Sequence, residues 1–261
     1  MIQYEGSSFH GFQKQNGLHT VQESLEKSIE TILREKVTIS AAGRTDSGVH
    51  AKGMIVSFTS ENSISNYEKF LLSINALTPD SITCIAGKEM PEDFHARFSC
   101  TEREYEYLFY QSKYPNPFLK GRAFWINKKI DKEKTISEMQ SLIGKHEFKS
   151  FTRASSLGEK SSERRITHLE WQESLEEQNL SKILIRGTGF LHNMVRILVG
   201  TILGIGSKNQ KMNLKEILLS EERANAGKTL PAYALYFLRA YYSKFPEINS
   251  LYEIITRKTL V

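Results

Sequence analysis

The chain has 261 residues and a formal net charge of +5 at pH 7, with 35 lysines and arginines against 30 aspartates and glutamates. This length allows one large domain or two smaller ones, and the mild positive charge is compatible with a polyanionic partner. Two cysteines exclude a disulfide framework, and the chain shows neither a membrane-spanning apolar run nor the pattern of a signal peptide, so we expect a cytoplasmic protein.

The first third of the chain predicts a regular alternation of strands and helices. Thr20 and Glu23 have the spacing of a capping box, and the apolar residues after them recur at helical spacing. Strands are expected at 37–42 and 52–59, a second helix at 66–77, and a strand at 82–89. With a short strand ahead of the first helix, the order is βαββαβ, which is typical of a ferredoxin-like sandwich.

The rest of the chain repeats this order loosely. The sequence predicts strands at 103–111, 164–174, 181–187 and 235–242, and helices at 131–143, 190–203 and 213–220. We therefore expect an α+β protein of two ferredoxin-like (RRM-like) βαββαβ halves, 1–95 and 96–261. The halves would share an extended, mainly antiparallel sheet with a central cleft.

The segment 41–51 is the stretch whose residues most suggest a reaction. It reads Ala-Ala-Gly-Arg-Thr-Asp-Ser-Gly-Val-His-Ala, and Gly43 and Gly48 bracket its polar residues. Arg44 and Asp46 are two residues apart, so in an extended segment their side chains leave on the same side. A guanidinium beside a carboxylate keeps the acid ionised and oriented, which suits a nucleophile or a base. The alternative is a polar turn with an incidental ion pair.

The strand expected at 103–111 carries an aromatic face made of Tyr105, Tyr107 and Phe109. A tyrosine there would stack on a base or accept a proton, or the face would simply belong to the core. The seven histidines lack the paired spacing of metal ligands, so no metal site is expected.

Two basic groups in the second half allow two interpretations each. His192 and Arg196 are four residues apart in an apolar helical pattern, so they would share one helix face. This basic stripe would face phosphates or support core packing. Arg164 and Arg165 begin a strand, where they would contact phosphate or form a solvated edge.

Taken together, these segments resemble the tRNA pseudouridine synthase A (TruA) family over nearly the whole chain. The resemblance is carried by motifs in the family's order: Tyr4-Glu5-Gly6-Ser7, Gly11-Phe12-Gln13, Val21-Gln22, Gly43-Arg44-Thr45-Asp46-Ser47-Gly48-Val49-His50-Ala51, Phe94-His95-Ala96-Arg97-Phe98, Arg103-Glu104-Tyr105-Glu106-Tyr107, Phe190–Thr201 and Leu235-Tyr236-Phe237. Among the departures from the family's usual pattern, only four residues precede Glu5 where the family has a fuller first strand, Glu5 stands in place of aspartate, and Ala234 stands in place of glycine.

The resemblance implies a homodimer that isomerises uridine to pseudouridine at positions 38, 39 and 40 of the tRNA anticodon stem-loop, without a cofactor. It implies that Asp46 is the essential carboxylate, that Arg44 pairs with it, that Tyr105 lies against the target base and that Leu235 forms an apolar wall of the pocket. We expect further contacts to the RNA from basic residues in segments flanking that pocket, namely Arg97, Arg153, Arg165, His192 and Arg196.

The chemistry of this reaction fits the residues present. A carboxylate can stabilise positive charge at the anomeric carbon, attack that carbon or remove a sugar proton, as in enzymes that act on glycosides. A phenol beside the base can accept or relay the proton lost from C5. The alternatives are a non-catalytic RNA-binding or RNA-folding protein on the same scaffold, and a pseudouridine synthase with another RNA target.

Overall fold

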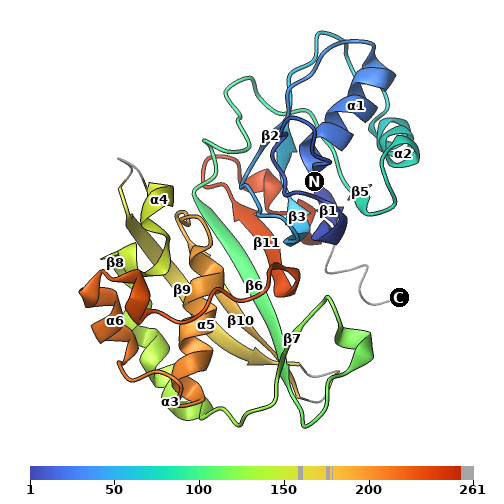
Figure 1. The fold of residues 1–261 in the computed structure, drawn as a ribbon. Coiled ribbons are helices and arrows are strands. Elements are labelled where there is room, and N and C mark those ends of the chain that lie inside the picture. The colour runs from blue at the N-terminus through green and yellow to red at the C-terminus, as the bar shows by residue number, and fades with distance from the viewer. Residues whose placement is uncertain (158–160, 175–176, 178, 254–261) are drawn as a thin grey trace. The chain divides into compact units, whose positions relative to one another are not determined.

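The computed structural model describes residues 1–157, 161–174, 177 and 179–253 (Figure 1). The chain forms two compact units, Met1–Arg103 with Tyr236–Val261, and Glu104–Leu235. This division differs from the expected halves 1–95 and 96–261, because the last strand of the chain packs with the first unit. The sequence could not show this, because the partner of a strand is chosen by long-range pairing.

Four strands of the first unit pair in the order β5-β1-β3-β11. Their bounds are β1 Ile2–Tyr4, β3 His50–Met54, β5 Ile82–Cys84 and β11 Leu235–Tyr241. Strand β1 pairs antiparallel with β3 and β5, whereas β11 pairs parallel with β3 and places Tyr236 opposite His50. The strand expected at 82–89 is thus shorter than predicted.

The strand expected at 37–42 does not join these four. It is reduced to β2 (Ser40–Ala41), which pairs antiparallel with β4 (Val56–Ser57) in a sheet of two strands. The preceding backbone is bonded to helix side chains instead: the amide of Ile39 donates to Glu26 Oε1 at 3.1 Å, and that of Val37 donates to Glu30 Oε1 at 3.4 Å. A periodic pattern cannot reveal such a substitution of partners.

Both helices predicted for the first unit are confirmed, as α1 (Val21–Leu33) and α2 (Tyr67–Leu77), which pack against each other. Thr20 caps α1 by accepting a hydrogen bond from the amide of Glu23 at 3.4 Å. The carboxylate of Glu23 pairs with Lys27 at 2.8 Å.

The second unit packs helices against one face of a sheet whose order is β6-β10-β9-β8, with β7 paired parallel to β6 (Figure 1). The strands are β6 Glu102–Gln111, β7 Phe124–Ile126, β8 Gly144–Glu147, β9 Glu163–Glu173 and β10 Leu180–Gly187. The helices are α3 Lys132–Met139, α4 Ala154–Leu157, α5 Met194–Gly206 and α6 Leu214–Ser220. The predicted α+β class with mainly antiparallel pairing is confirmed, although the sequence did not predict β7, β8 or α4.

The main helix of the second unit begins later than its apolar pattern predicts. Asn193 has a left-handed backbone with φ of 61°, and α5 starts at Met194. The expectation that His192 and Arg196 share one helix face is therefore wrong, because His192 precedes the helix.

Within the described residues, no helix has the length and apolar character to cross a membrane.

Candidate active site

Asp46 begins a tight turn between β2 and β3. Its carbonyl accepts a hydrogen bond from the amide of Val49 at 3.1 Å, and Gly48 has a φ of +78°. A turn of this kind requires positive φ at its third residue, which glycine adopts without strain. Arg44 is exposed, Thr45 is buried and Asp46 is half-buried, so the alternation expected for an extended segment is present. The turn fixes the backbone that carries the acid.

Two glycines allow the N-terminal segment to pack directly against this turn. A Cβ on Gly6 would lie 2.0 Å from the carbonyl oxygen of Val49, and one on Gly11 would lie 2.8 Å from that of Thr45. The hydroxyls of Tyr4 and Thr45 are hydrogen bonded at 2.8 Å in the interior. Motifs that lie forty residues apart in the sequence therefore form one support for Asp46.

Arg103 ties the aspartate loop to the segment 94–100. Its guanidinium donates hydrogen bonds to the carbonyl oxygens of Ala42 at 2.9 Å, Cys100 at 3.0 Å and Arg97 at 2.8 Å. A planar guanidinium with a fixed fork of donors suits this bridging role better than a lysine. Sequence reasoning did not assign Arg103 a role, although it opens one of the family motifs.

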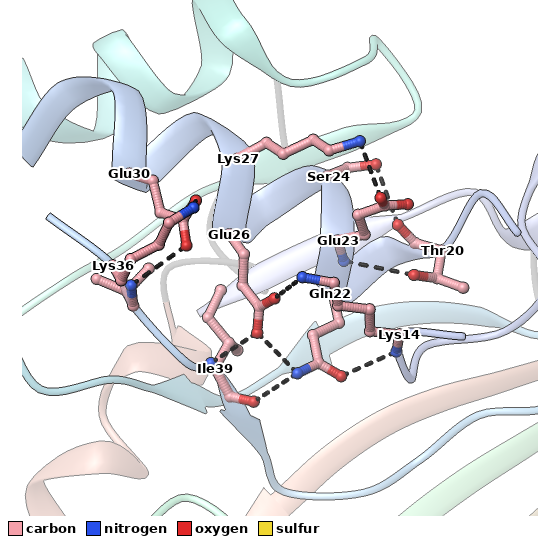
Figure 2. A network of polar contacts seen from close by, with 11 residues as sticks. Lys14, Thr20, Gln22, Glu23, Ser24, Glu26, Lys27, Glu30, Lys36 and Ile39 are labelled. Atoms are coloured by element: carbon pink, nitrogen blue, oxygen red, sulfur yellow. Dashed lines mark hydrogen bonds and ion pairs between the residues drawn. The ribbon is translucent and has the colours of Figure 1, made fainter. Parts of the chain in front are cut away.

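Glu26 of α1 holds the chain that leads into β2. Figure 2 shows its carboxylate accepting hydrogen bonds from Gln22 Nε2 at 2.8 Å and from the amide of Ile39 at 3.1 Å, with Lys14 Nζ 3.2 Å away. Glu26 is 4% exposed, and a buried carboxylate needs such partners. Charged residues on a helix usually face water, so no pattern in the sequence indicated this role.

Arg44 lies within the field of another arginine, Arg97. Desolvation, and after it the like charge of Arg97, lowers the pKa of the Arg44 guanidinium. The two exposed arginines thus form a positive surface beside the aspartate turn. The ion pair of Arg44 with Asp46 stays a prediction.

In the second unit, the aromatic face of β6 is buried as a whole. Tyr105 meets Phe190 edge to face with ring centroids 5.3 Å apart, and the hydroxyl of Tyr107 donates to the carbonyl of Pro231 at 3.0 Å. Burial raises the pKa of Tyr107 far above its ordinary value. Tyr107 therefore serves as a packing and anchoring residue, while the role of Tyr105 at a base stays a prediction.

Helix α5 positions the segment that leads to Leu235. Arg196 Nε donates to the carbonyl of Leu230 at 2.7 Å, and the amide of Gly227 donates to Thr201 Oγ1 at 2.8 Å. A Cβ on Gly200 would lie 2.0 Å from the carbonyl oxygen of Lys228, so only glycine permits this approach. Leu235 itself is buried, at the start of β11.

Basic residues gather before the start of α5. His192 Nδ1 lies 3.1 Å from Ser156 Oγ, and the His192 carbonyl accepts a bond from Thr152 Oγ1 at 3.1 Å. Burial, and after it the like charge of nearby Arg153, lowers the pKa of Arg223. Arg223 was missed by sequence reasoning because it lies in an irregular segment.

Of the residues predicted for the site, the structure places Arg44, Asp46 and Arg97 in the first unit and the remainder in the second. Arg165 is exposed on β9 there. Within the described residues, no three histidines, cysteines or acids gather in a way that would hold a metal ion. The first unit therefore offers a carboxylate on a rigid turn beside a positive surface, which suits chemistry on an anionic substrate.

Comparisons with known proteins agree with these motifs. The model of a family described as tRNA pseudouridine synthase matches residues 1–99 and 139–243. The tRNA pseudouridine synthase A of Leptospira biflexa is 46% identical over 261 residues, and the match covers 97% of each chain. Its counterparts in Acetivibrio thermocellus and Bacillus subtilis are 38% and 36% identical over 244 residues, with 93% and 92% of this chain and 98% and 97% of those relatives covered.

Proposed function

Because this chain belongs to the tRNA pseudouridine synthase family, we propose that it isomerises uridine to pseudouridine at positions 38, 39 and 40 of the tRNA anticodon stem-loop. It does so as a cytoplasmic homodimer and without a cofactor. The observation that carries the proposal is Asp46, half-buried on a turn that Gly48 shapes and that the Tyr4–Thr45 hydrogen bond supports.

The reaction breaks the bond between N1 of uracil and C1′ of ribose and forms a bond between C5 and C1′. C5 loses its proton and N1 gains one, so the product is an isomer and no electrons are exchanged. Asp46 stabilises positive charge at C1′, attacks C1′ or removes a proton from the sugar. Its rigid turn favours each of these roles, because a reacting group held in place avoids the entropic cost of orientation.

The uridine must leave the base stack before its C1′ and C5 can be reached. Arg44, beside Asp46 in sequence, fills or holds the opening. Tyr105 lies against the flipped base and assists removal of the C5 proton, and Leu235 supplies an apolar wall. Arg97, Arg153, Arg165, His192 and Arg196 contact the RNA backbone, because phosphates favour such cationic partners.

The proposal is tested by mapping pseudouridine in tRNA with the purified protein and with its Asp46→Asn variant. The amide keeps the size of the carboxylate and loses its charge, so we expect turnover to disappear while folding and tRNA affinity stay close to those of the wild type. Asp93→Asn is the matched control, because Asp93 is an exposed acid of the same unit that pairs with Lys244.

Mass-spectrometric mapping of tRNA from cells that lack the protein identifies the positions modified. Loss of pseudouridine at positions 38 to 40 supports the proposal, and loss at other sites or in another RNA assigns a different target. If the wild-type protein bound tRNA without forming pseudouridine, the chain would be a non-catalytic RNA-binding or RNA-folding protein instead. Sedimentation of the purified protein at micromolar concentration tests the dimer.

A further inference from the structure

The segment 94–99 is a rigid loop that exposes an aromatic ring. The amide of His95 donates to Ser99 Oγ at 3.0 Å, and the amide of Ser99 returns a bond to the His95 carbonyl at 2.9 Å. The Nδ1 atom of His95 accepts from the amides of Arg97 at 3.1 Å and Phe98 at 3.2 Å. At the end of this bonded turn, Phe98 is 78% exposed.

The loop is also anchored to the body of the first unit. The amide of Ala96 donates to Ser57 Oγ at 3.0 Å, and its carbonyl accepts from the hydroxyl of Tyr242 at 2.7 Å in the interior. Arg103 holds the carbonyl of Arg97 at 2.8 Å. These bonds hold the backbone on either side of Phe98, and so they fix the point from which its side chain leaves the loop.

The groups around the ring indicate what it contacts. The His95 ring supports it at a centroid distance of 4.4 Å, and the guanidinium carbon of Arg97 lies 5.7 Å from its centroid. Desolvation, and after it the like charge of Arg97, lowers the pKa of Arg44, so positive charge is concentrated near this loop. An exposed aromatic ring beside an arginine matches a nucleotide, whose base stacks on the ring and whose phosphate pairs with the guanidinium. An apolar protein surface would pack on the ring but would offer no negative charge to the neighbouring Arg97.

We propose that Phe98 is a stacking platform for an unpaired base of the RNA substrate next to the reacting uridine, with Arg97 on the adjoining phosphate. This inference rests on the proposed function for its ligand, since it takes the substrate to be RNA with unpaired nucleotides. Phe98 thereby places the strand relative to Asp46, in the same unit.

The test compares the tRNA affinity of the wild type with that of Phe98→Ala, Phe98→Leu and Phe98→Trp over a range of salt concentrations. Removing one stacked base weakens binding by roughly five- to 150-fold, and we expect this loss in Phe98→Ala. Leucine restores apolar area without a π face and should bind like alanine, whereas tryptophan should bind at least as well as the wild type. Phe118→Ala is the matched control, because Phe118 is also a strongly exposed ring, 85% exposed, in the other unit.

Salt dependence separates stacking from charge. Phe98 carries no charge, so Phe98→Ala should lower affinity by the same factor at every salt concentration. Arg97→Ala should flatten the log–log slope by roughly 0.7 to 0.9, the value of one phosphate contact. A fully paired RNA duplex should bind wild type and Phe98→Ala alike. Thermal midpoints should match, since the ring is largely exposed.

Four results would overturn the proposal: unchanged tRNA affinity of Phe98→Ala, rescue by leucine, an equal loss in Phe118→Ala, or a change in sedimenting mass, which would make the ring a contact between copies. Pseudouridine formation by the wild type is measured in parallel. Its absence counts against the proposed reaction, whereas unchanged binding of Phe98→Ala to tRNA counts against the platform.

Discussion

Gly6→Ala tests whether the placement of the Asp46 turn controls the reaction. The new Cβ would lie 2.0 Å from the carbonyl oxygen and 2.5 Å from the carbonyl carbon of Val49, and both atoms belong to the backbone. To restore an ordinary contact of about 3.4 Å, the two segments must separate by roughly 1.4 Å. The hydrogen bond from the amide of Gly6 to His50 Nδ1, now 3.0 Å long, would be strained as well.

A misplacement of about 1 Å costs on the order of a hundredfold in rate, so we expect single-turnover formation of pseudouridine by Gly6→Ala to fall by about that factor. Overpacking of this kind also destabilises by about 1–3 kcal/mol, which lowers the thermal midpoint by roughly 2–4 °C for each kcal/mol. The basic residues are untouched, so tRNA affinity should change little. The assay is tritium release from tRNA that carries uridine tritiated at C5.

The matched control is Gly87→Ala in the same unit. A Cβ there would meet nothing closer than 3.5 Å, the Cδ2 atom of Leu71, so its activity should equal that of the wild type. If Gly6→Ala turned over tRNA at the wild-type rate, the close approach of Gly6 to Val49 would have no part in positioning Asp46. An equal loss in Gly87→Ala would show that the assay reports general damage.

Three further predictions follow from the second unit and from the buried thiol. Tyr105→Phe should lose most of its activity yet keep its tRNA affinity. Tyr107→Phe should keep its activity and lose about 1 kcal/mol of stability, because its hydrogen bond to a carbonyl is removed. Equal activities of the two variants would show that Tyr105 has only a packing role. Arg196→Ala should flatten the salt dependence of tRNA binding by about one phosphate contact. It should also lower the thermal midpoint, because the hydrogen bond of Arg196 to the carbonyl of Leu230 is lost. An unaltered slope would show that Arg196 has a structural role only. Burial raises the pKa of the Cys84 thiol from 9.0 to about 11. The contribution of this thiol to the free energy of unfolding should therefore be complete below pH 9 and decline as the pH rises from 9 to 11. Denaturant titrations of Cys84→Ala should lack this decline.

The sequence by itself determined the features that depend on neighbouring residues. Thr20 caps α1, the apolar spacing after it gives the helix, and Gly48 supplies the positive φ of the Asp46 turn. These outcomes follow from local hydrogen bonding and steric limits, which a short window of residues contains. The family resemblance was also readable, because its motifs are contiguous runs of residues, and the comparisons confirmed it.

Only the tertiary structure decided which distant segments meet. Strand β11 pairs with β3 and so belongs to the first unit, while the amides of Val37 and Ile39, which were expected in a strand, donate to Glu30 and Glu26. Arg103 became a bridge between two loops because carbonyls of both converge on it, and no pattern in the sequence encodes that convergence. Asn193 started α5 late by adopting a left-handed backbone inside an apolar run. In each case the partner lies far along the chain or the backbone departs from its local preference, and the free energy of packing the whole unit decides the outcome.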